Sequence, residues 1–124
     1  MIPRFRVWLP DIDQMLRVKA LVFEKDKTRC VCGYSFDFYL EDENATIMQS
    51  TGILDKNSQE IFEGDILKNN KYITSVFYER GAYCVKFRRT TNTTVTMNVR
   101  SFIEKYKTKI VGNIYENPEL LEGE

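Results

Sequence analysis

Residues 48–67 read MQSTGILDKNSQEIFEGDIL, and this stretch decides the fold. Gly52 interrupts an extended run, residues 55–58 supply a polar chain reversal, and Gly64 makes a short turn before the apolar pair Ile66 and Leu67. Glycine lets the backbone bend sharply between two sheets, as it does in many small SH3-like barrels. The stretch therefore predicts a mainly β fold, either a small SH3-like barrel or a barrel-like β domain.

Alternation of polar and apolar residues extends this prediction in both directions. Residues 4–8 and 16–20 alternate with a period of two, and the turn residues 10–13 between them predict a hairpin. Further extended runs are expected at 30–34, 73–78, 83–87, 95–99 and 109–115. Strands spaced by about 8 to 12 residues are typical of an all-β barrel or sandwich.

Helical signals are confined to the end of the chain. Asn117 can cap a helix, Pro118 suits the first helical position, and Glu119 suits the positive N-terminal end, so a short C-terminal helix is predicted. Residues 35–45 leave two alternatives, a short helix or an acidic loop.

Length and composition indicate one folded domain over residues 1–124. Charged residues make up 29% and apolar residues 43%, which is ordinary for a globular protein. No window approaches the roughly 20 apolar residues that a membrane helix needs, so we expect no membrane association and a cytoplasmic location. Cys30, Cys32 and Cys84 are an odd set, which fits a reducing compartment better than a disulfide framework.

The sequence contains no recognisable catalytic or metal-binding motif. It has no histidine, which removes the commonest proton-transfer group and metal ligand at neutral pH. A structural zinc site usually has four Cys or His ligands, and the chain has only three cysteines. Glu63 and Asp65 flank Gly64, and they are better suited to stabilising a turn than to catalysis. No phosphate-binding glycine motif is present. We therefore expect a protein that is not an enzyme and has no cofactor or metal.

Charge is distributed unevenly along the chain. Residues 67–115 hold 10 Lys or Arg and only 2 Asp or Glu, although the whole chain has a net charge of zero. Cations near aromatic residues can bind nucleic acid in small barrels, so the basic region 86–109 is an alternative site for an anionic partner. Alternation along 83–87 should place the aromatic side chains in the core and the cationic side chains at the surface. The cations could then still contact phosphate groups, but stacking of bases on the aromatic rings is disfavoured. The candidate residues are Lys86, Arg88, Arg89, Arg100, Lys105 and Lys107.

Three segments together resemble the YopX-like family of bacteriophage and prophage proteins. They are Arg4-Phe-Arg-Val-Trp8, the pattern MQ-TG-D-N-I-EGDI within 48–66, and GNIYENPELL at 112–121. The resemblance implies a phage or prophage origin, a mostly β architecture and self-association, and it brings no catalytic residue. Family members usually have Gly where Ser58 stands, so a left-handed backbone there is harder in this chain unless Asn57, which tolerates positive φ, takes that place. This departure leaves the type of turn open.

These observations predict a non-enzymatic phage accessory protein that acts by binding. The partner is either another copy of the chain, in a homo-oligomer, or a host or phage macromolecule. Apolar groups near the end of a chain need a surface to cover them. The candidates for self-association are Tyr115, Leu120 and Leu121, with docking onto the same chain as the alternative.

Overall fold

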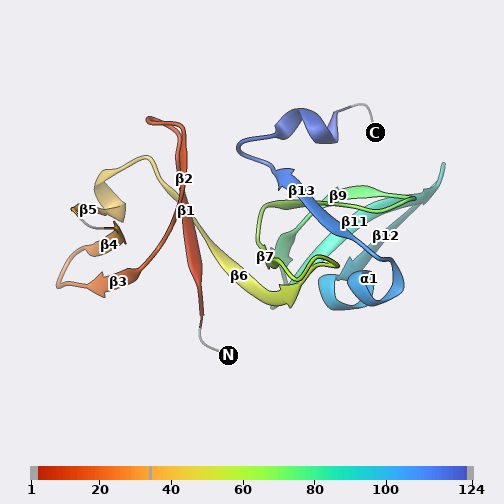
Figure 1. Cartoon of the computed structure of the whole chain (residues 1–124), viewed down its shortest axis with the longest axis horizontal. Helices are drawn as coiled ribbons and strands as arrows, with labels where there is room; N and C mark the ends of the chain where they lie inside the picture. The colour runs from red at the N-terminus through yellow and green to blue at the C-terminus, as the bar shows by residue number, and fades with distance from the viewer. Residues whose placement is uncertain (1–2, 34, 123–124) are drawn as a thin grey trace. The chain divides into compact units, whose positions relative to one another are not determined.

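The fold is mainly β, as the sequence predicted. In a computed structural model, which describes residues 3–33 and 35–122, strands hold 55% of the described residues and helices 12% (Figure 1). The residues divide into two compact units, 1–49 and 50–124, and strand β6 (Thr46–Leu54) passes from one to the other. The expectation of one domain over residues 1–124 stays a prediction. No helix in the described part of the chain is long and apolar enough to cross a membrane.

The first unit contains two small antiparallel sheets. In one, β1 (Phe5–Leu9) lies between β2 (Gln14–Arg17) and the first half of β6, and this confirms the predicted hairpin. In the other, the order is β3 (Ala20–Phe23), β4 (Thr28–Gly33) and β5 (Phe36–Tyr39). The core of this unit is a cluster of Val7, Leu9 and Cys30, with partly buried hydrophobic residues around it.

Residues 35–45 contain a short helix, one of the two expected structures, but also a strand that was not expected. Phe36–Tyr39 is a strand, and Leu40–Asp42 is a short 3-10 helix, η1. The strand forms because Phe36 and Phe38 alternate with polar Asp37, and because Phe38 lies opposite Cys30 on β4. In the predicted extended run 30–34, β4 ends at Gly33, and Tyr34 lies outside the described residues.

The second unit contains three short antiparallel arrangements and a helix. The second half of β6 pairs with β7 (Glu60–Phe62). The second sheet has the order β13 (Lys109–Asn113), β8 (Asp65–Lys68), β9 (Ile73–Ser75), and the third has the order β10 (Phe77–Glu79), β11 (Ala82–Thr90), β12 (Thr93–Asn98). Helix α1 (Val99–Lys105) follows β12, and a 3-10 helix, η2 (Pro118–Leu121), ends the described chain (Figure 1).

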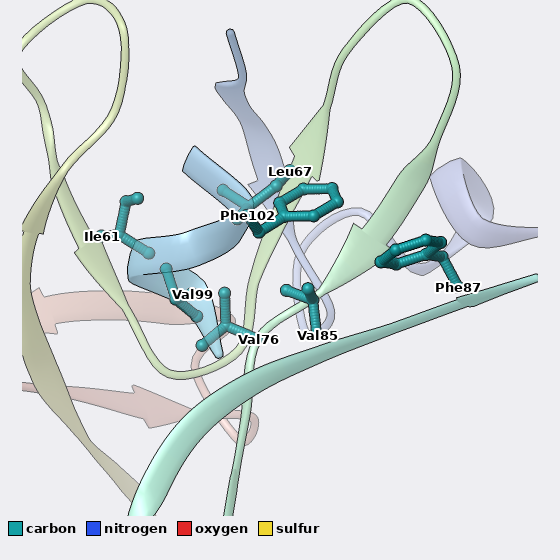
Figure 2. Packing of buried hydrophobic residues seen from close by; sticks show 7 residues of the cluster. All are labelled: Ile61, Leu67, Val76, Val85, Phe87, Val99 and Phe102. Carbon is teal, nitrogen blue, oxygen red and sulfur yellow. The ribbon is translucent and has the colours of Figure 1, made fainter. Parts of the chain in front are cut away.

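The core of the second unit is built around α1. Val99 and Phe102 reach from the helix toward Leu67 on β8, Val85 on β11, and Val76, which lies between β9 and β10 (Figure 2). Phe102 also packs on the ring of Phe87, with the ring centroids 5.4 Å apart. The full buried cluster is Ile61, Leu67, Val76, Val85, Phe87, Val99 and Phe102.

The helices correct two details of the sequence analysis. The run 95–99 was expected to be extended, but α1 begins at Val99 because the Asn98 side chain accepts a hydrogen bond from the Ser101 amide at 2.8 Å. The predicted short C-terminal helix is present as η2, but Asn117 does not cap it with its side chain. The Asn117 carbonyl oxygen, Oδ1, accepts from the Asn113 amide instead, at 3.2 Å.

Candidate functional site

The predicted basic residues lie on the surface, but they do not form one patch. Lys86 and Arg88 leave β11 on the face opposite the buried Val85 and Phe87. Because Phe102 of α1 packs on Phe87, the helix lies on the other face of the strand. The predicted cations therefore come from several elements: Lys86, Arg88 and Arg89 from β11, Arg100 and Lys105 from α1, and Lys107 from the segment after the helix. The full predicted set, all exposed, is Lys86, Arg88, Arg89, Arg100, Lys105 and Lys107.

The predicted self-association residues at the C-terminus are half-buried. Tyr115, Leu120 and Leu121 follow β13 and are neither fully covered nor fully exposed. The turn that leads to them is held by Asn113, whose Oδ1 accepts hydrogen bonds from the Tyr115 amide at 3.0 Å and the Glu116 amide at 2.8 Å. A role for the three residues in self-association stays a prediction.

Two carboxylates of the 48–67 stretch, Asp55 and Asp65, accept hydrogen bonds from the backbone of the chain itself. Asp55 is only 5% exposed, and it accepts hydrogen bonds from the amides of Asn57, Gln59 and Ile110 at 2.8 to 2.9 Å. Asp65 accepts one from the Phe62 amide at 2.7 Å. These carboxylates hold turns in place, and the bond to Ile110 ties the 55–59 turn to β13.

Two turns show why particular residue types stand in them. Ser58 itself takes the left-handed conformation, with φ of 63°, and Asn57 does not take its place. At Gly112, a Cβ atom would lie 2.5 Å from Oδ1 of Asn117. Glycine is therefore needed there so that the Asn117 side chain can lie over the strand and reach Asn113.

The cysteines are in the positions of small apolar residues. Cys30 is fully buried in the core of the first unit, and its Sγ lies 3.8 Å from that of Cys32. Burial, with the Cys32 thiol beside it, raises the pKa of Cys30 to about 12. Cys84 lies in the second unit, where its thiol approaches the Ala82 carbonyl oxygen at 3.8 Å. Among residues 3–33 and 35–122, no three His, Cys, Asp or Glu side chains come together as a metal site would require.

The first unit has a hollow that the sequence analysis did not predict. It has a volume of about 190 Å³ and lies between the β1–β2 turn and the segment from β5 to residue 44. Two of its apolar residues are open to solvent, Ile12 at 52% exposure and Phe36 at 40%. We call this site the acidic-rimmed hollow, and its lining residues are Leu9, Asp11, Ile12, Phe36, Phe38, Glu43 and Asn44.

The rim carboxylates differ from the other acidic groups nearby. Asp42 pairs with Lys27 at 2.7 Å, and Glu41 accepts a hydrogen bond from the Thr28 amide at 2.7 Å, which lowers the pKa of Glu41. Asp11 and Glu43 are exposed, and within the described residues their side chains have no ion pair or hydrogen bond. The acidic run 41–43 thus has two carboxylates that fasten η1 to the β3–β4 turn and one that faces the hollow.

Two signals in the sequence pointed toward this hollow. Ile12 is an apolar residue inside an otherwise polar turn, and Phe36 and Phe38 alternate with Asp37. Neither signal says that residues near position 12 meet residues near position 36, because that proximity depends on how the two sheets pack. The hollow is therefore a product of tertiary structure.

Together these features define a small, mainly β protein in which Asp55 and Asp65 hold turns in place and large apolar side chains are exposed in both units: Ile12, Phe23 and Phe36 in the first, Leu54 and Tyr78 in the second. A family model described as YopX protein matches residues 4–122, and the chain belongs to this family. The chain is also similar to the solved structure titled "Crystal structure of protein EF1440 from Enterococcus faecalis", with a TM-score of 0.65 and 26% identity. That similarity covers 98% of this chain and 99% of the other. A search of curated proteins gave no match.

Proposed function

We propose that this protein is a non-enzymatic accessory protein of a phage or prophage that acts by binding in the bacterial cytoplasm. It binds either copies of itself or a host or phage macromolecule. The observation that supports this proposal best is the exposure of large hydrophobic side chains in the first unit, where Phe23 is 79%, Ile12 52% and Phe36 40% exposed. The free energy falls when a partner covers apolar groups that are exposed at a surface.

The buried carboxylates of Asp55 and Asp65 support the proposal in a second way. A catalytic carboxylate has to reach a substrate, whereas Asp55 and Asp65 are buried and hydrogen-bonded to backbone amides. These two carboxylates stabilise turns, so a protein that binds through its surface fits them better than an enzyme does.

Sedimentation velocity over a range of protein concentrations tests self-association. We expect a mass above that of one chain, rising with concentration, and a weaker association when Leu120 and Leu121 are both changed to serine. Leu54→Ser, at an exposed leucine of the second unit outside the predicted set, is the matched control. A chain that stays monomeric and also captures no phage or host macromolecule would contradict the proposal, and so would turnover of a small molecule.

An alternative function is nucleic-acid binding through the basic region 86–109. It is supported by the exposure of all six cations, because phosphate contact does not require stacked aromatic rings. In a salt titration with random DNA or RNA, affinity should fall steeply as salt rises, and Arg88→Ala with Arg89→Ala should reduce the slope. Lys25→Ala, an exposed cation of the first unit, is the control. Affinity that does not respond to salt would reject this alternative.

A further inference from the structure

The acidic-rimmed hollow lies next to the free edge of a sheet. Strand β5 is the last strand in the order β3-β4-β5, so one side of its backbone has no neighbouring strand in that sheet. Edge strands present backbone N–H and C=O groups that can pair with another extended chain. Phe36 and Phe38 both line the hollow, so the strand with the free edge also supplies the apolar wall.

The size of the hollow suits one apolar side chain. A cavity of about 150 Å³ is large enough to hold benzene. The volume here is about 190 Å³, and the walls are provided by Leu9, Ile12, Phe36 and Phe38. A leucine or phenylalanine side chain would therefore fit, and it would cover the exposed parts of Ile12 and Phe36.

The charge at the rim indicates which groups should accompany that side chain. Asp11 and Glu43 line the hollow, and within the described residues no cation neutralises them. Two copies of the chain that met hollow to hollow would bring four carboxylates together, which is unfavourable. A partner that carries Lys or Arg beside its apolar side chain would instead be attracted.

We propose that the acidic-rimmed hollow binds an extended segment of another protein, which adds to β5 as a further strand. An apolar side chain of the segment fills the hollow, and a Lys or Arg two residues away, on the same face of the added strand, reaches Asp11 or Glu43. The backbone bonds give affinity, and the apolar and cationic side chains give specificity. This inference rests on the proposed binding function and names the class of partner.

Selection of random peptides displayed against the full chain tests the proposal. Selected peptides should combine an apolar residue with Lys or Arg at a spacing of two. Phe36→Asp should abolish the selection, whereas Phe23→Ser, which removes an exposed ring outside the hollow, should not change it. Circular dichroism of each variant shows whether the fold is kept, and Phe36→Ser gives a milder test of the same wall.

Affinity measurements with one selected peptide separate the two parts of the contact. Reversing both rim charges, Asp11→Lys with Glu43→Lys, should weaken binding roughly tenfold, and the wild-type affinity should fall as salt rises. Asp26→Lys, in the β3–β4 turn, is the charge control and should have little effect. Proline at a peptide position whose amide pairs with β5 should remove binding, and alanine there should not.

Several results would overturn the inference. Selected peptides without cations, peptides that tolerate proline throughout, or peptides that bind Phe36→Asp as well as wild type would each do so. If the rim and wall variants instead abolish self-association, the occupant is a second copy, and the proposal of another protein is wrong. Self-association that survives these variants, with no peptide selected, would refute only this inference and leave the proposed function standing.

Discussion

The two units of the chain differ in how fully they bury their hydrophobic residues. The second unit has a cluster of seven buried residues, backed by the rings of Tyr72 and Tyr106. The cluster of the first unit has three buried members, and three large side chains of that unit are exposed, compared with Leu54 and Tyr78 in the second. A small core with exposed apolar groups is typical of a region that completes its packing on a partner. We therefore propose that the larger core of the second unit supplies more of the stability and that the hollow of the first unit supplies a binding surface.

The largest expected effect is that of emptying the core of the second unit. Phe102 is fully buried and contacts both Phe87 and Tyr106, so Phe102→Ala should lower the free energy of unfolding by about 3 to 5 kcal/mol. Chemical denaturation measures the loss. Phe23→Ala, at a side chain that is 79% exposed, should leave stability nearly unchanged.

Hydrogen exchange on the same variant tests the comparison directly. If the units unfold separately, Phe102→Ala should speed exchange in residues 50–124 and leave β4 as it was. Faster exchange of the β4 amides by the same amount would show that the chain unfolds as one domain. The sequence predicted that result, and it would break the division of roles between the units.

A smaller effect is expected at the turn that ties the second unit together. Asp55→Asn keeps one oxygen but replaces the other with a donor facing the Ile110 amide, whose hydrogen bond is then lost. We expect a loss of about 2 kcal/mol in the free energy of unfolding, measured by denaturation, because a buried amide is left without a partner. Asp26→Asn, in an exposed turn of the first unit, is the control. Equal stability of the two variants would mean that the Asp55 contacts do not hold the second unit together.

The sequence could predict what depends on local pattern. Alternation of polar and apolar residues identified β1 and β11, because this pattern can be read from consecutive residues. Val85 and Phe87 are buried, as that pattern predicted. The same reasoning missed α1, since Val95 to Val99 also alternates and the cap at Asn98 outweighed that pattern. Once the cap is recognised, Val99, Phe102, Ile103 and Tyr106 have helical spacing. The hollow required knowing which turn meets which strand, and local pattern does not contain that information.

A further test concerns the close approach at Gly112. Gly112→Ala places a methyl group 2.5 Å from Oδ1 of Asn117, so the Asn117 side chain must move and give up its bond to the Asn113 amide. We expect a loss of about 1 to 2 kcal/mol in the free energy of unfolding. Gly33→Ala in the first unit is the matched control, because nothing lies within 4 Å of the added carbon. A larger loss at Gly33 than at Gly112 would contradict this account of the β13 turn.

The smallest expected effect is a gain in stability. Ser58 has a φ of 63°, a conformation that costs a residue with a Cβ more than it costs glycine. Ser58→Gly should therefore raise the free energy of unfolding by about 0.5 to 1 kcal/mol. Ser101→Gly, inside α1, is the opposite control and should lower it by about 1 kcal/mol, since glycine is a poor helix former. If both variants lose stability equally, the Ser58 turn carries no strain. Replacing Ser58 would then give the second unit no gain in stability that could offset the incomplete packing of the first unit.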